Sequence, residues 1–108
     1  DIVHGQGADL AGYLAIRSGR PCVVTVHGLL AECAKFQTNF TERIRAKLSA
    51  RLTERSTIRR AEHLIAISPY VARYYRGEIS GRVHHIPNAV ARKFFDVVRS
   101  PESGRLLY

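Results

Sequence analysis

Four short, uninterrupted apolar runs constrain the fold of this chain more than any other feature. They occupy residues 1–4, 22–26, 63–67 and 83–86, and segments with helical spacing separate them. Short continuous runs rich in Val and Ile are typical of strands buried on both faces of a parallel sheet. The alternation of such strands with helices therefore predicts an α/β fold, a Rossmann-like three-layer sandwich whose parallel sheet is covered on both faces.

Helices are predicted in the intervals between these runs. Three helices are expected at residues 9–17, 40–60 and 70–76, and shorter helical turns within 29–39 and near 92–95. Ser68 and Pro69 precede the third helix, where Ser suits the N-cap and Pro suits the first helical position. A Pro, Ser and Gly-rich linker is expected at 99–104, and residues 106–108 are expected to open another strand.

Length and charge narrow the classes of partner. The chain has 108 residues, a length that suits one domain. Its net charge of +8 suits a partner that is nucleic acid, an anionic membrane or a phosphorylated substrate. Its longest uncharged stretch, 21–31, is far shorter than the ~20 residues of a spanning helix. The two cysteines, Cys22 and Cys33, lack the spacing of a zinc site, and we expect reduced thiols in a reducing compartment such as the cytoplasm.

Polar residues and glycines follow the predicted strands directly. His4 ends the first run, His27 and Gly28 follow the second, Ser68 follows the third, and Asn88 lies just after the fourth. Ligands of parallel sheets bind at the carboxyl ends of the strands, so these residues are the candidate site. Glycine allows close backbone approach to a ligand, and histidine donates, accepts or transfers protons near neutral pH.

Several familiar motifs are absent from the sequence. Gly5 and Gly7 lack the third glycine of a dinucleotide-binding loop, and no phosphate-binding P-loop occurs. Ser68 lacks the flanking glycines of a nucleophile elbow. No cluster of Cys and His has the spacing of a metal site, so we expect no metal.

The predicted helix 40–60 is strongly basic and carries seven cations and two carboxylates. Its apolar residues form an i, i+4 stripe: Phe40, Ile44, Leu48 and Leu52. Two interpretations stay open: a helix packed on the core with a solvated basic side, or a helix that docks on acidic lipids. The cations expected to touch a membrane are Arg43, Lys47, Arg51 and Arg55.

Four runs together resemble a known family: residues 1–4, 24–28, 64–69 and 86–90, with Phe95 behind them. In this order and spacing they resemble the acceptor-side domain of the retaining glycosyltransferases of family four, which have a B-type fold of two Rossmann-like domains. The resemblance implies that residues 1–98 form part of the acceptor-side domain. It also implies that 99–108 form the interdomain linker and the first strand of a missing donor-binding domain, so that the chain is a piece of a longer protein.

The resemblance also implies a function for each candidate residue. His27 would lie in the interdomain cleft near the transferred sugar and the leaving phosphate and act in catalysis, while His4, Gly28, Ser68 and Asn88 would bind substrate. Ala89 and Ala91 depart from the family pattern, which has Gly and Asp there. Glu54 and Glu62 reproduce the spacing of the family's paired glutamates, but that motif belongs to the second domain, and we interpret the match as chance.

The activity implied is retaining hexosyl transfer from a nucleotide-sugar donor to a glycan or lipid-linked acceptor, in cell-envelope or exopolysaccharide biosynthesis. No cofactor, metal or nucleic acid is expected to take part, and the fragment alone is expected to be inactive. Its expected location is the cytoplasm, with peripheral attachment to the inner face of the plasma membrane. One alternative is a basic module that binds nucleic acid or an anionic membrane through helix 40–60. Another is a different nucleotide-binding α/β domain, which the missing glycine fingerprint disfavours.

Overall fold

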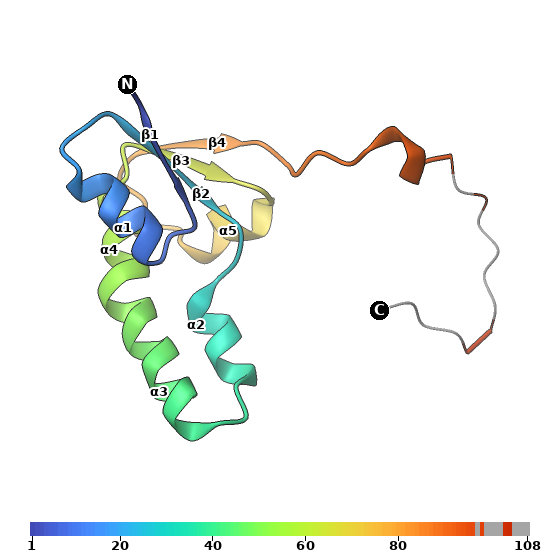
Figure 1. Cartoon of the computed structure of the whole chain (residues 1–108), viewed down its shortest axis with the longest axis horizontal. Coiled ribbons are helices and arrows are strands. Elements are labelled where there is room, and N and C mark those ends of the chain that lie inside the picture. The colour runs from blue at the N-terminus through green and yellow to red at the C-terminus, as the bar shows by residue number, and fades with distance from the viewer. Residues whose placement is uncertain (97, 99–102, 105–108) are drawn as a thin grey trace.

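A computed structural model describes residues 1–96, 98, 103 and 104 of the chain. Four parallel strands form one sheet in the order β1-β2-β3-β4 (Figure 1). Their bounds are β1 Val3–Gln6, β2 Cys22–Val26, β3 His63–Ala66 and β4 Arg82–His85. The prediction of a Rossmann-like α/β fold with a parallel sheet is confirmed.

Helices connect successive strands, as the sequence predicts. They are α1 Leu10–Arg17, α2 Leu30–Cys33, α3 Phe40–Ser49, α4 Arg55–Arg60 and α5 Pro69–Tyr74, with 3₁₀ turns at Ala34–Phe36 and Arg92–Phe94. Among the residues that the structure describes, no helix combines the length and the apolar character needed to cross a bilayer. The predicted linker and final strand lie outside the described residues, apart from a turn at Ser103 and Gly104.

The core lies on one face of the sheet. Val24, Val26 and Leu64 of the strands are buried there together with Ile58 of α4 and Val71 of α5. Each connection moves one strand further in the same direction, and crossovers of one hand then place every connecting helix on the same face. Helical cover on both faces was predicted, and within the described part of the chain the helical layer packs on this one face.

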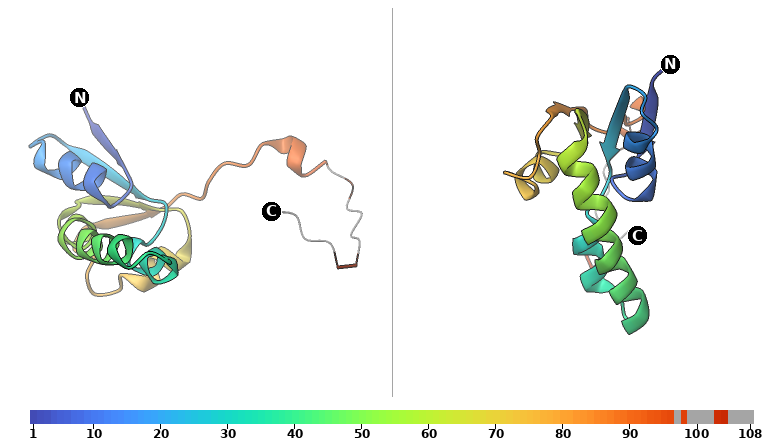
Figure 2. Two further views of the ribbon diagram at one scale, coloured as in Figure 1. Left: turned by 60° about the horizontal axis from the view of Figure 1, so that its bottom comes forward. Right: turned by 90° about the vertical axis from the view of Figure 1, so that its left-hand side faces the viewer.

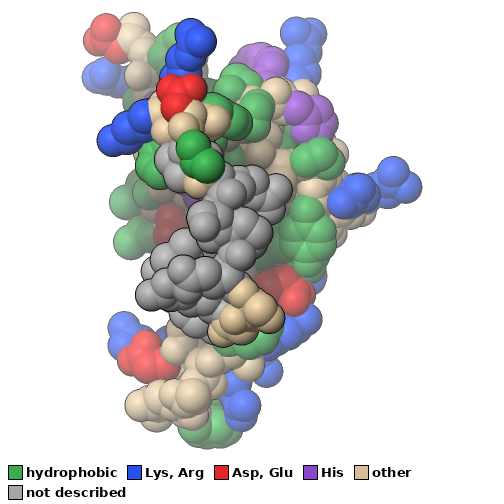
Figure 3. Space-filling view, turned by 90° about the vertical axis from the view of Figure 1, so that its right-hand side faces the viewer, with side chains coloured by type: hydrophobic (Ala, Val, Ile, Leu, Met, Phe, Trp, Pro, Cys, Tyr) green, Lys and Arg blue, Asp and Glu red, His purple; other side chains and the backbone are tan. Residues whose placement is uncertain are grey.

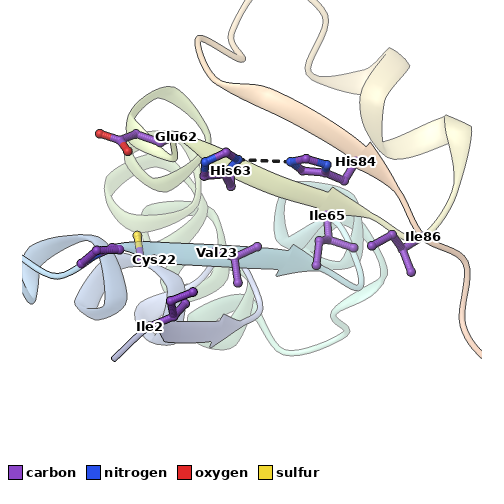
Figure 4. Close-up of a pocket in the computed structure, with 9 residues that line it drawn as sticks. Ile2, Cys22, Val23, Glu62, His63, Ile65, His84 and Ile86 are labelled. Carbon is purple, nitrogen blue, oxygen red and sulfur yellow. Dashed lines mark hydrogen bonds between the residues drawn. The ribbon is translucent and has the colours of Figure 1, made fainter.

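The opposite face of the sheet carries alternate strand residues. Val23, Ile65 and Ile86 line a hollow of about 410 Å³ on this face, with the helices behind the sheet (Figure 4). His63 and His84 line the same hollow, and Nδ1 of His63 lies 3.2 Å from Nε2 of His84. This surface is therefore mainly apolar, with one histidine pair.

The predicted end of the first strand at His4 is wrong, because β1 continues to Gln6. The Gly at position 5 suggests a strand end, but here it serves packing. A Cβ at Gly5 would lie 2.9 Å from the Cα of Gly12 in α1. The bare backbone of Gly5 thus lets α1 approach the strand without interrupting it.

The segment 40–60 is not one regular helix. A π-helical turn at Ala50–Glu54 separates α3 from α4. Ala50, Glu54 and Ile58 are buried, whereas α3 projects beyond the sheet (Figures 1 and 2). The interpretation of the apolar stripe as core-packed is wrong: Phe40, Ile44, Leu48 and Leu52 are 64%, 48%, 54% and 62% exposed.

Gly12 provides a test of the contact between α1 and the rest of the core. A Cβ there would collide with the carbonyl oxygen of Gly7 and lie 2.8 Å from the Cγ2 of Thr57. We expect Gly12→Ala to lower the free energy of unfolding by about 1–3 kcal/mol, because overpacking outweighs the gain of about 1 kcal/mol in helix propensity. Urea denaturation followed by circular dichroism measures the change.

Gly28→Ala is the matched control, because the same methyl group at Gly28 meets no atom within 4 Å. An equal loss of stability in both variants would contradict the packing argument.

Candidate functional site

A cavity of about 270 Å³ lies where β1 and β2 end. It is lined by the loops that follow these two strands and by one side chain from the later π-helical turn. The residues used below are Gln6, Gly7, Asp9, His27, Gly28 and Glu54. The cavity therefore lies at the carboxyl edge of the sheet, where ligands of parallel α/β sheets bind.

Four side chains form a hydrogen-bonded row that leads to this cavity. Nε2 of His27 lies 2.7 Å from Oε1 of Gln6. The amide nitrogen of Gln6 lies 3.2 Å from Nδ1 of His4, and Nε2 of His4 lies 2.8 Å from the hydroxyl of Thr25. Thr25 is buried, whereas His27 is exposed. The row thus connects the sheet to a histidine that solvent or a ligand reaches.

The chemistry of Gln6 fixes the direction of its bond to His27. An amide oxygen only accepts, so Nε2 of His27 carries the proton and donates to Gln6. The amide nitrogen of Gln6 donates to the His4 ring, at 3.2 Å from Nδ1 and 3.3 Å from Nε2, and the direction of the bond between His4 and Thr25 follows the tautomer of that ring. Nδ1 of the neutral His27 ring is left as an acceptor. The site can therefore accept a hydrogen bond from a ligand hydroxyl at a fixed position.

The loop after His27 is open on one side and anchored on the other. A Cβ at Gly28 would meet no protein atom within 4 Å, and Gly28 has no positive φ. Neither packing nor backbone conformation in the described chain therefore requires glycine at this position. Beyond it, the carboxylate of Glu54 accepts from the amides of Leu30 at 2.7 Å and Ala31 at 3.3 Å.

The candidate residues from the sequence fall into two groups. His27 and Gly28 line the cavity, and His4 reaches it through Gln6. Ser68 takes the N-cap position of α5, but in the described chain its hydroxyl makes no capping bond. Asn88 is exposed and follows the last residue of β4 by three positions. Both come after the carboxyl ends of their strands, but neither lines this cavity.

Sequence reasoning missed Gln6, Thr25 and Glu54. Gln6 lies between two glycines, which suggest a turn. However, His4 and Gln6 are two positions apart, which is the spacing of side chains on one side of a strand. Thr25 lies within an apolar run that suggests burial alone. No local signal identifies Glu54, because its partners are 23 and 24 residues earlier in the chain.

The cations expected at a membrane lie along α3 and the turn after it. Arg43 lies over the ring of Phe40 at 5.6 Å, and Arg55 lies 4.0 Å from Glu78. Lys47 and Arg51 line one shallow hollow with Ile44 and Leu48 of the exposed stripe. In a space-filling view, Lys and Arg side chains outnumber acidic ones and apolar side chains reach the lower end of the molecule (Figure 3).

Other reactive groups include two cysteines and a buried tyrosine. Both cysteines are free, and Cys33 lines the cavity. Burial, and next the charge of Glu62, raises the pKa of Cys22. Burial, and next the Glu54 carboxylate, raises the pKa of Tyr75 far above its usual range. No group of three or more His, Cys, Asp or Glu side chains that could hold a metal ion occurs among the described residues.

Comparison with known proteins gives one match. The family model described as Glycosyltransferase Family 4 matches residues 1–94. No curated protein and no solved structure matches the chain. The matched residues include β1 to β4 and the whole cavity described above.

The hydrogen bond to Gln6 predicts the tautomer of His27. We expect the neutral His27 ring to carry its proton on Nε2, and we expect Gln6→Ala to shift the ring toward a mixture of tautomers, because the acceptor is lost. Long-range ¹H–¹⁵N correlation spectra above the titration range measure this population. The exposed His85 serves as the internal reference, and an unchanged His27 spectrum in Gln6→Ala would contradict the assigned direction of this bond.

Proposed function

The chain belongs to glycosyltransferase family 4, and we propose that it forms the acceptor-side part of an enzyme that transfers a sugar from a nucleotide-sugar donor to a glycan or lipid-linked acceptor. The proposal includes hexosyl transfer with retention of anomeric configuration. One observation carries it: the family match includes the cavity at the carboxyl edge, where His27 presents a fixed acceptor nitrogen.

In this proposal, His27 is the catalytic residue. Its Nδ1 accepts a hydrogen bond from a hydroxyl of the transferred sugar, while Gln6 holds Nε2 at 2.7 Å. Gly28 leaves room for the sugar beside the backbone, which explains a glycine that the described chain itself does not require. His4 orients Gln6, and Ser68 and Asn88 bind substrate further along the same edge.

A second domain, which we place after residue 98, binds the donor nucleotide in the proposed enzyme. Basic side chains and helix N-termini of that domain stabilise the charge on the leaving diphosphate, so the reaction requires neither a metal nor another cofactor. Closure of the two domains excludes water that would otherwise hydrolyse the donor. The acceptor-side part then needs only a few polar groups held in fixed positions at its edge. The hydrogen-bonded row from Thr25 to His27 provides such groups.

The exposed stripe on α3 supports attachment of this part to an acidic membrane. Phe40, Ile44, Leu48 and Leu52 present apolar side chains to solvent, and Arg43, Lys47, Arg51 and Arg55 alternate with them along the chain. An amphipathic helix of this kind inserts its apolar face among lipid tails, and each nearby cation contributes about 1 kcal/mol on anionic lipid. We place the enzyme at the cytoplasmic face of the plasma membrane, in cell-envelope or exopolysaccharide biosynthesis.

Nucleic acid is the less suitable partner for the same surface. Phosphate backbones select cations, and single-stranded bases select aromatic side chains. Aliphatic Ile44, Leu48 and Leu52 offer neither contact, although they make up most of the stripe. A membrane uses both the cations and the stripe.

Activity of the complete two-domain protein tests the role of His27. We expect His27→Ala to lower kcat for sugar transfer about 10²–10³-fold without a change in unfolding midpoint, because a hydrogen bond made in a closed, dry site is lost. Steady-state transfer of radiolabelled sugar measures kcat. His85→Ala, an exposed histidine outside the cavity, is the control, and normal turnover in His27→Ala would refute the assignment.

Sedimentation with lipid vesicles tests the docking surface. We expect the chain to bind anionic vesicles and to leave them at high salt. Lys47→Glu together with Arg51→Glu should weaken partitioning by at least about 2 kcal/mol, roughly thirtyfold. Leu48→Ser should weaken binding to anionic vesicles at low salt, where the unmodified chain binds.

Arg76→Glu together with Arg82→Glu makes the same change in net charge elsewhere on the surface and is the control. Equal recovery on anionic and neutral vesicles, or equal losses in the two double variants, would rule out this docking surface.

A further inference from the structure

Glu54 is a buried carboxylate with an unusual set of partners. It is 1% exposed and is the last residue of the π-helical turn between α3 and α4. Both of its oxygens accept from backbone amides, Oε1 from Leu30 at 2.7 Å and Oε2 from Ala31 at 3.3 Å. These amides belong to the first turn of α2, which begins three residues after His27.

The beginning of α2 requires such a partner. The first amides of a helix have no partner within the helix, and a side chain at the N-cap normally accepts from them. Here the N-cap residue is Leu29, which has no acceptor and is itself buried. Glu54 takes over this role from a distant part of the chain. The π-helical turn, which widens the helix by one residue, coincides with the position from which the carboxylate reaches α2.

Burial of a carboxylate is costly unless hydrogen bonds compensate it. The two amides of α2 provide that compensation. Bonds to an ionised acceptor are stronger than neutral ones. The contact therefore ties α2 firmly to the helical segment that precedes β3.

We propose that Glu54 is the positioning residue of the site: it clamps the start of α2 and so fixes the loop that carries His27 and Gly28. This inference rests on the proposed function of His27. Glu54 forms part of the cavity wall, but it is 1% exposed and both of its oxygens bind backbone amides, so it acts through the loop and not on substrate. Since it occupies the amides of Leu30 and Ala31, the start of α2 is not a binding site for the donor phosphates.

Glu54→Gln separates this role from simple packing. The variant keeps the size of the side chain, but one accepting oxygen becomes an NH₂ group that faces a backbone donor. The charge that strengthens the remaining bond is lost as well. The start of α2 should open locally while the sheet stays closed. Glu42→Gln makes the same change at an exposed position of α3 and is the matched control.

Amide hydrogen exchange of the full chain and transfer kinetics of the two-domain protein together test the proposal. We expect the amides of Leu30 and Ala31 to exchange at least about tenfold faster in Glu54→Gln, since each charged hydrogen bond contributes that much or more. The amides of Leu64 and Ala66 in β3 should be unchanged. In the same variant kcat should fall at least about tenfold while KM for the donor stays within a factor of about two, because the clamp acts on His27 and not on donor binding.

Unchanged exchange at Leu30 and Ala31 would overturn the proposal, as would unchanged kcat in an enzyme whose wild type is active. Equal acceleration of the β3 amides would also overturn it, because Glu54 would then support the whole fold. A wild-type protein without transfer activity would refute the proposed function instead, and local exchange alone would then decide whether Glu54 clamps the loop.

Discussion

The one-way order of the strands is the constraint on which the rest of this structure depends. Each crossover advances from one strand to its neighbour, so all four carboxyl ends meet at one edge and the connecting helices pack on one face. The edge receives the loops with His27, Ser68 and Asn88. The opposite face keeps Val23, Ile65 and the His63–His84 pair around a hollow (Figure 4). The position of the candidate site and the uncovered face of the sheet thus both follow from the strand order.

The side-chain amide of Gln6 determines which nitrogen of His27 carries the proton. Its oxygen accepts from Nε2 of His27, and its amide nitrogen donates to the ring of His4. The buried hydroxyl of Thr25 ends the row inside the sheet. A histidine without this support would sample both tautomers. Here the strand pairing of β1 with β2 supplies the order, since Gln6 and Thr25 are partners in register.

The sequence allows the strands, the helices and the edge with His27 to be predicted, because apolar periodicity and strand ends are local properties. Prediction failed where distant contacts decide. Gly5 suggested a strand end, but α1 packs on it. The stripe from Phe40 to Leu52 has the spacing of a buried face, yet the segment turns its opposite side, with Ala50, Glu54 and Ile58, to the core. Nothing in the sequence indicates the role of Glu54 at α2, because its partners come from another connection between strands.

The helical segment from Phe40 to Arg60 has two sides with different contacts. The stripe on one side faces outward, where the proposed membrane contact lies. On the other side, at the end of the π-helical turn, Glu54 faces inward and holds the start of α2 beside His27. Leu52 and Glu54 are two positions apart, about 200° around a helix axis, so one segment presents the stripe to solvent and Glu54 and Ile58 to the core. In the proposed enzyme, this segment therefore carries both the surface that meets the lipid and the side chain that holds the loop beside His27.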